Sequence, residues 1–238
     1  MSNHNIVWIN KDIQDQINHH WFQPQFWQEK NAIIGSSEGR SSTYFVQKDN
    51  NQWVLRHYYR GGWVARFSKD RYFFLNEKNS RAFAEFELLK QMRKLQLPVP
   101  KPIAAHIQRS FLFYRSNIIV ERLQGYDNLF AWLEQKQLSP KAWRDIGATI
   151  ALFHYHRIDH KDLNIRNILY NGDKVYLIDF DRCVQKNQHG RWQNKNIARL
   201  LRSLQKEITI NPELHWDSAQ WNDLITGYQT KFQQLTFN

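Results

Sequence analysis

Cysteine and long apolar segments are the features this sequence most clearly lacks. Its single cysteine, Cys183, excludes an internal disulfide framework and is compatible with a reducing cytosol. No apolar run approaches the roughly 18 residues typical of a membrane-spanning helix. The amino-terminal Met-Ser-Asn-His-Asn has neither the basic region nor the apolar region of a secretory signal. No segment repeats or is of low complexity, which argues against solenoids and propellers. We therefore expect a protein that stays in the compartment where it is made.

Acidic residues are also scarce relative to basic ones. The 238 residues include 33 Lys+Arg and 22 Asp+Glu, for a formal net charge of +11. Such a balance predicts anionic partners, namely nucleic acid, phosphorylated metabolites or an anionic membrane surface. A hydrophobic content of 42% excludes a disordered chain. The length fits one large domain or two small lobes.

Short strands and one helix are expected in the amino-terminal half. Brief apolar runs at 32–34, 43–46 and 52–56 are separated by polar turns, as in an antiparallel meander. A helix is predicted from Ser80 to about Leu95, because its apolar residues recur at helical spacing. Prolines at positions 98, 100 and 102 end it. Two more strands are predicted at 111–114 and 118–120.

The carboxy-terminal half is predicted to be mainly helical. A short helix is expected at 128–136, and Ser139-Pro140 opens another that continues through Phe153. Asn171-Gly172 between two apolar runs predicts a hairpin. Strands followed by helices indicate an α+β fold with two lobes, which we assign to 1–121 and 122–238.

The hairpin carries the residues most suited to chemistry. Asp162 and Asn167 lie on a polar loop before its first strand, and Asp179 follows its second strand. Carboxylate and amide oxygens, together with phosphate oxygens, are the ligands that Mg²⁺ prefers. A carboxylate outside the metal shell can accept a proton from an attacking hydroxyl.

These motifs resemble the protein-kinase superfamily: His160-Lys161-Asp162 with Asn167 is similar to its catalytic loop, and Asp179-Phe180 to its metal-binding motif. The resemblance implies a two-lobed fold that binds ATP in a cleft, with Asp162 as catalytic base and Asn167 and Asp179 as Mg²⁺ ligands. It also implies four ATP-binding residues, which are Gly39 in a glycine-poor turn, Arg56 in place of the usual lysine, Glu85 as its partner, and Glu121 at the lobe connection. His57 or Arg60 is a candidate to share the phosphate-neutralising task of Arg56.

The chain after Asp181 is short, and it has no Ala-Pro-Glu motif to close an activation segment. With Arg56-His57-Tyr58-Tyr59-Arg60-Gly61-Gly62 and Ile178-Asp179-Phe180-Asp181-Arg182, the sequence looks like the bacterial lipopolysaccharide-core kinases, and most like the 3-deoxy-D-manno-octulosonic acid (Kdo) kinases among them. That resemblance implies transfer of the ATP γ-phosphate to the 4-hydroxyl of a Kdo residue on lipid A, at the cytoplasmic side of the inner membrane.

Two basic segments fit an anionic glycolipid acceptor and an anionic membrane surface. The first interleaves aromatic residues with cations, of which Arg60, Arg66, Lys69 and Arg71 are the predicted acceptor or membrane contacts. The second is a basic stripe, Lys195 to Lys206, on the outward face of a predicted helix. No nucleic-acid-binding motif is present, so nucleic acid is not an expected partner. The sequence does not predict an oligomeric state.

Three alternatives stay open. The first two concern the acceptor, which would be a heptose of the inner core or another small hydroxyl compound. In the third, the protein would be a non-catalytic nucleotide-binding module at the membrane. His154, His156 and His160 have a spacing that superficially suggests zinc, although no cysteine lies nearby.

Overall fold

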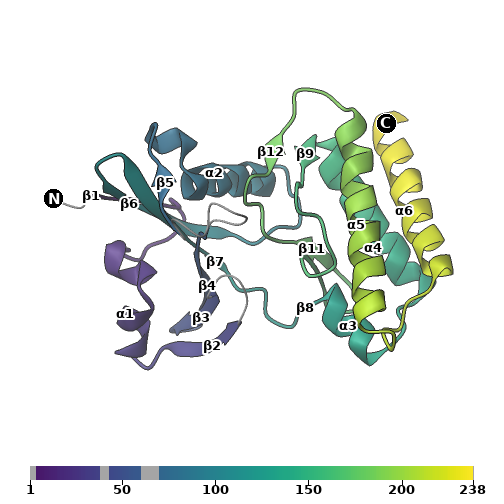
Figure 1. Cartoon of the computed structure of the whole chain (residues 1–238), viewed down its shortest axis with the longest axis horizontal. Coiled ribbons are helices and arrows are strands. Elements are labelled where there is room, and N and C mark those ends of the chain that lie inside the picture. The colour runs from purple at the N-terminus through teal and green to yellow at the C-terminus, as the bar shows by residue number, and fades with distance from the viewer. Residues whose placement is uncertain (1–3, 38–42, 60–69, 238) are drawn as a thin grey trace. The chain divides into compact units, whose positions relative to one another are not determined.

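The structure is a computed structural model that describes residues 4–37, 43–59 and 70–237. Its contacts divide the chain into two compact units. Unit 1 comprises Met1–Gln91 and Pro100–Gln124, and unit 2 comprises Met92–Val99 and Gly125–Asn238. Figure 1 labels the helices and strands of both.

Unit 1 is built on one antiparallel sheet. Along the sheet the strands follow the order β1 (His4–Ile9), β6 (Pro102–Ser110), β7 (Phe113–Glu121), β4 (Asn51–His57), β3 (Thr43–Lys48) and β2 (Ile33–Ser37), and the short β5 (Tyr72–Phe73) pairs with the start of β7. Each pairing between these strands is antiparallel.

The two faces of this sheet carry different elements. Helix α2 (Arg81–Lys94) covers one face, where the rings of Trp8 and Phe83 lie 4.9 Å apart. A buried cluster that includes tryptophans from η1 (His19–Phe22), α1 (Pro24–Gln28) and β4 covers the other. Because successive strand residues point to opposite faces, Arg56 and His57 of β4 project to different sides of the sheet.

Unit 2 combines four helices with two small sheets. The helices are α3 (Leu129–Gln135), α4 (Pro140–Tyr155), α5 (Arg191–Ile210) and α6 (Ser218–Phe237), and the strands are β8 (Asp127–Asn128), β9 (Ile158–Asp159), β10 (Ile168–Tyr170), β11 (Val175–Leu177) and β12 (Val184–Gln185). Asn128 and Ser139 cap α3 and α4, since each side chain accepts a backbone N–H of the first turn. Figure 1 shows α6 running alongside α4, and these two helices pack closely on one another.

Two glycines let α4 and α6 approach backbone to backbone. A Cβ atom on Gly147 would lie 2.0 Å from the carbonyl oxygen of Leu224, and one on Gly227 would lie 2.1 Å from that of Arg144. No side chain fits at either position without moving a helix. The crossing fixes α4, which leads directly into the loop that carries Asp162.

The α+β prediction is confirmed, including the predicted helices and the hairpin of β10 and β11. Six strands were missing from the sequence-based prediction: the long strands β1 and β6, and the two-residue strands β5, β8, β9 and β12. The predicted strands at 111–114 and 118–120 form the single strand β7, and residues Phe111 and Leu112 form the turn of a hairpin between β6 and β7. The apolar residues on both sides of 115–117 had suggested two strands, whereas the polar residues between them belong to the same strand.

Candidate active site

The loop between β9 and β10 brings the candidate catalytic residues of unit 2 together. The side-chain amide of Asn167 donates to the carbonyl oxygen of Asp162 at 3.0 Å. The backbone N–H of Ile178, the residue before Asp179, donates to the carbonyl oxygen of Asn167 at 3.0 Å. One hydrogen-bonded cluster therefore links the three positions that the sequence singled out.

Backbone geometry at Asp179 is unusual. Its φ of 62° lies in the left-handed region, which aspartate adopts more readily than most side chains. The next residue, Phe180, is buried, and its ring lies 5.9 Å from Phe153 of α4. The buried phenylalanine anchors the segment on the core directly beside the carboxylate.

His160 ties the loop to the same segment. Its Nε2 donates to the carbonyl oxygen of Ile178 at 3.0 Å, and its ring lies 4.8 Å from Phe180. Burial lowers the pKa of His160, so its imidazole is neutral with the proton on Nε2. Its buried Nδ1 has no hydrogen-bond partner among the described residues. These contacts are those of a structural residue.

The residues present fit a magnesium ion. The Asn167 amide is oriented by its donated bond, so its nitrogen and oxygen are distinguished, and the oxygen is a hard ligand. Asp179 adds a carboxylate. Within the described part of the chain, no group of three or more His, Cys, Asp or Glu side chains is arranged to hold a metal. Two protein oxygens completed by phosphate and water are the arrangement typical of nucleotide-bound Mg²⁺.

Arg56 and Glu85 are in contact in unit 1. Arg56 Nη1 donates to Glu85 Oε1 at 2.9 Å, and the hydroxyl of Tyr58 donates to Glu85 Oε2 at 2.5 Å. Only 2% of the Glu85 side chain is exposed. A carboxylate this buried needs such partners, and they fix the arginine relative to α2.

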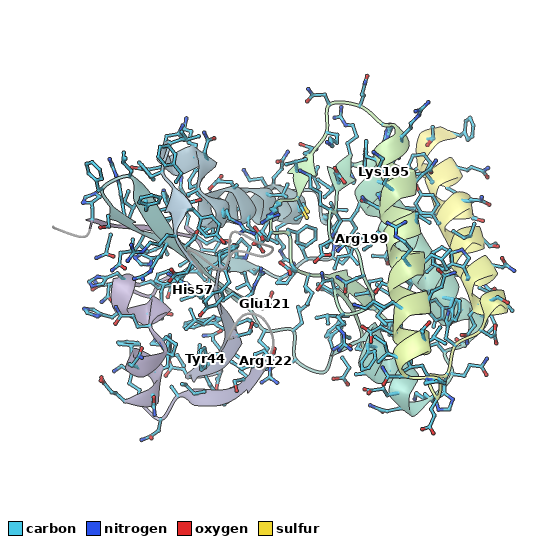
Figure 2. All side chains as sticks on the ribbon, in the orientation of Figure 1. Tyr44, His57, Glu121, Arg122, Lys195 and Arg199 are labelled. Atoms are coloured by element: carbon cyan, nitrogen blue, oxygen red, sulfur yellow. The ribbon has the colours of Figure 1, made fainter. Side chains whose placement is uncertain are left out.

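His57 does not join Arg56 on that face of the sheet. Its Nδ1 lies 2.7 Å from Asn117 Oδ1, and its Nε2 lies 3.3 Å from Asp70 Oδ2. Figure 2 labels His57, together with Glu121 at the end of β7. The Glu121 side chain accepts the backbone N–H of Lys101 at 3.0 Å, so it holds β6 against β7.

Five of the site residues predicted from the sequence remain to be located, and the structure describes one of them. Arg71 is exposed just before β5. Gly39, Arg60, Arg66 and Lys69 lie outside the described residues.

Helix α5 makes contacts with the catalytic loop that the sequence did not predict. Asn196 accepts the backbone N–H of His160 at 3.0 Å and donates to Asp159 Oδ1 at 3.0 Å. Further along the helix, Arg199 forms an ion pair with Asp162.

The contacts continue toward the end of α5. Ser203 Oγ accepts the N–H of Ile165 at 3.3 Å, and Glu207 binds Arg166 at 3.2 Å. The loop thus runs parallel to α5, held at successive turns of one face. Polar residues spaced three and four apart beside an apolar stripe are the signal that would have indicated these contacts.

Comparison with known proteins agrees with this description. Residues 24–228 match the model of the lipopolysaccharide kinase (Kdo/WaaP) family. The chain is 40% identical over 211 residues to a 3-deoxy-D-manno-octulosonic acid kinase of Vibrio vulnificus, covering 88% of this chain and 89% of that protein. It is 38% identical over 235 residues to the enzyme of the same name from Actinobacillus succinogenes, covering 95% and 97%.

A solved structure shows the same fold. "WaaP in complex with acyl carrier protein" matches with a TM-score of 0.59 and 13% identity, over 98% of this chain and 92% of that one. The fold and the relatives together define a phosphotransferase that acts on a hydroxyl group. The chain belongs to the lipopolysaccharide kinase (Kdo/WaaP) family.

Proposed function

We propose that this protein transfers the γ-phosphoryl group of ATP to the 4-hydroxyl of a Kdo residue on lipid A. The observation that carries the proposal is the hydrogen-bonded cluster of Asp162, Asn167 and the residue preceding Asp179. The names of relatives that match most of the chain at about 40% identity support Kdo as the acceptor.

In this reaction a bond forms between the acceptor oxygen and the γ-phosphorus, and the bond from that phosphorus to the bridging oxygen of ADP breaks. Asp162 orients the acceptor hydroxyl and takes its proton. Asn167 and Asp179 would hold Mg²⁺, which would supply neutralisation of the triphosphate charge.

The nucleotide also has ligands in unit 1. Arg56 supports the phosphates, and Glu85 and Tyr58 fix its guanidinium. Gly39 contributes a backbone donor to the phosphates, and the backbone at Glu121 meets the adenine. Positioning and charge neutralisation supply most of the catalysis in phosphoryl transfer, so these residues need little covalent chemistry of their own.

A membrane-facing surface is part of the proposal. Large hydrophobic side chains are exposed around the β6–β7 turn and β5, which are Phe73, Leu75, Phe111, Leu112 and Phe113. The rings of Phe73 and Phe113 lie 6.2 Å apart, and the Arg109 guanidinium lies 4.4 Å from the ring centre of Phe74. Aromatic side chains beside cations suit an anionic bilayer interface. Of the helices described, none is long and apolar enough to cross a membrane.

Phe111 is the most informative residue of this surface. It is 74% exposed and has a φ of 53°, a conformation that favours glycine at the first position of a two-residue hairpin turn. Neither burial nor backbone preference accounts for a phenylalanine there. Insertion into the acyl boundary of an anionic membrane does, and we place the protein peripherally on the cytoplasmic side of the inner membrane.

Sedimentation with vesicles of phosphatidylethanolamine and phosphatidylglycerol tests this surface. Phe111→Gly should reduce vesicle binding several-fold without lowering the thermal midpoint, because glycine suits the turn. Phe237→Ala removes an aromatic that is 86% exposed on α6 and serves as the control. Equal vesicle binding by wild type and Phe111→Gly would remove the β6–β7 turn from the membrane contact.

The function itself is tested by transfer of labelled phosphate from ATP to purified acceptors. Kdo–lipid A should be phosphorylated, whereas an acceptor whose only added hydroxyls belong to inner-core heptose should not. Transfer to the heptose alone would establish the heptose-kinase alternative, and failure to use any acceptor while ATP is bound would establish a nucleotide-binding module.

A further inference from the structure

Helix α5 carries a row of cations beside the loop that holds Asp162. Lys195, Arg199, Arg202 and Lys206 are spaced by four, three and four residues, so at 3.6 residues per turn they share an arc of about 60°. All four are exposed, whereas Leu200 and Leu204 on the other side of the helix are buried. Figure 2 labels Lys195 and Arg199, which lie on successive turns.

Arg199 is placed to bind two anions. It contacts Asp162, and both side chains remain about half exposed. A guanidinium has five N–H donors in a planar fork, so the bond to Asp162 leaves donors for a second carboxylate. Arg199 is therefore able to bridge the catalytic carboxylate and an anionic group of the acceptor.

Lys195 lies on the side of Arg199 from which an acceptor would approach. The catalytic loop runs parallel to α5, from Asn196 opposite His160 to Glu207 opposite Arg166. The proposed metal ligand Asn167 follows Arg166 in the chain, and Arg166 is the residue that Glu207 binds. The acceptor and the leaving group of a phosphoryl transfer lie roughly in line on opposite sides of the phosphorus. The acceptor thus belongs toward the Lys195 end of α5.

Lys195 has no competing role in the fold. It pairs with no acidic side chain among the described residues, and it lies about 6 Å along the helix axis from Arg199. Two cations one turn apart, only one of them paired, leave positive charge beside Asp162.

The proposed acceptor carries a matching anion. Three carbon–carbon bonds separate the carboxylate carbon of Kdo from the carbon that bears the 4-hydroxyl. When that hydroxyl meets Asp162, the carboxylate is within reach of a neighbouring cation. Heptose has no carboxylate, so a cationic site at this position would also select between the two acceptor sugars.

We propose that Lys195 and Arg199 form the binding site for the carboxylate of the acceptor sugar, with Arg199 bridging that carboxylate and Asp162. This inference rests on the proposed function, since it specifies how the same acceptor is recognised. Lys195 binds the acceptor alone, whereas Arg199 also positions Asp162.

The test combines protein variants with two acceptors. Initial rates are measured with Kdo–lipid A and with its carboxamide derivative, in which the sugar carboxylate is neutral. Lys195→Gln should raise the KM for Kdo–lipid A about tenfold, as expected for loss of a charge-assisted hydrogen bond, and should leave the KM for ATP unchanged. With the carboxamide, wild type and Lys195→Gln should have the same KM.

Arg202→Gln is the matched control, because Arg202 lies on the same exposed face toward the other end of the helix. It should change neither KM. An equal rise in KM for Lys195→Gln and Arg202→Gln, persisting with the carboxamide, would assign the whole row to general attraction for the anionic membrane and overturn the carboxylate site.

Two variants of Arg199 distinguish its role in binding the acceptor from its role in positioning Asp162. Arg199→Gln should raise the acceptor KM and lower kcat, and Arg199→Lys should recover most of the KM but not kcat, since lysine restores the charge without the fork. Unchanged kinetics in both variants would overturn the role of Arg199. A wild-type enzyme that phosphorylates Kdo–lipid A but shows no preference for the carboxylate over the carboxamide would overturn this inference alone, whereas wild type inactive on both would overturn the proposed function with it.

Discussion

The ion pair between Arg56 and Glu85 predicts how much unfolding free energy is lost when the arginine is replaced, because the Glu85 carboxylate is buried. Glu85 is 2% exposed and Arg56 is 20% exposed, and the carboxylate accepts bonds from Arg56 and Tyr58 only 2.9 and 2.5 Å long. Replacing Arg56 by methionine leaves a buried carboxylate without its counter-ion. Such a loss typically costs about 3–5 kcal/mol of unfolding free energy, and we expect about 3 kcal/mol because Tyr58 still donates to Glu85.

A double-mutant cycle isolates this interaction. Glu85→Leu should cost less than Arg56→Met, because the arginine left behind is partly exposed and can reach water. The double variant should be more stable than the sum of the two losses predicts, with a coupling energy of about 2 kcal/mol. On the same helix, Lys90 pairs with Glu87 at the surface, and Lys90→Met should change stability by less than about 0.5 kcal/mol.

Urea unfolding followed by tryptophan fluorescence measures all of these variants. Strictly additive losses for Arg56→Met and Glu85→Leu would refute the reasoning, because they would mean that the carboxylate does not depend on the arginine. The same variants report on function, since Arg56→Met should raise the KM for ATP and leave the KM for the acceptor unchanged.

Three further predictions concern the metal, the helix crossing and pH. Asp179→Ala should weaken Mg·ATP binding measured calorimetrically as well as turnover, and an unchanged affinity would make the metal assignment wrong. Gly227→Ala should destabilise the fold by about 1–3 kcal/mol, because the added Cβ would overlap the Arg144 carbonyl. Gly190→Ala should not destabilise it, because a Cβ at that position would lie 3.8 Å from its nearest neighbour, a side-chain atom. Burial lowers the pKa of His106 and His154 to about 4, so the unfolded chain binds more protons below pH 6.5 and stability should fall from there to about pH 4 by up to about 3 kcal/mol for each histidine. Unfolding midpoints that do not change from pH 7 to pH 4.5 would contradict this pH dependence.

Local signals in the sequence were sufficient for the elements that carry the site. Ser139-Pro140 fixed the start of α4, and Asn171-Gly172 fixed the hairpin after which Asp179 lies. Strand β6 was missed because the prolines that end the preceding helix, the last of them Pro102, also mask the start of the strand. The strand forms because its residues pair with β1 and β7, and such long-range pairing has no local signature.

The contacts of α5 show a second limit of sequence reasoning. Periodicity placed Arg199 on an exposed basic face, which the structure agrees with. It could not show that this face borders the catalytic loop, since Arg199 and Asp162 are 37 residues apart and meet only through the packing of α5. The pairing of Arg56 with Glu85, by contrast, was expected from the family resemblance, and the two side chains are in contact where α2 covers the sheet.

The central claim is that Asp162 accepts the proton during phosphoryl transfer to Kdo. Single-turnover transfer of labelled phosphate from ATP to Kdo–lipid A, by wild type and by Asp162→Asn, tests it most directly. Asparagine keeps the shape but loses the proton acceptor, so the rate should fall by at least about a hundredfold while ATP affinity stays within about twofold. Transfer by Asp162→Asn at close to the wild-type rate would contradict the account.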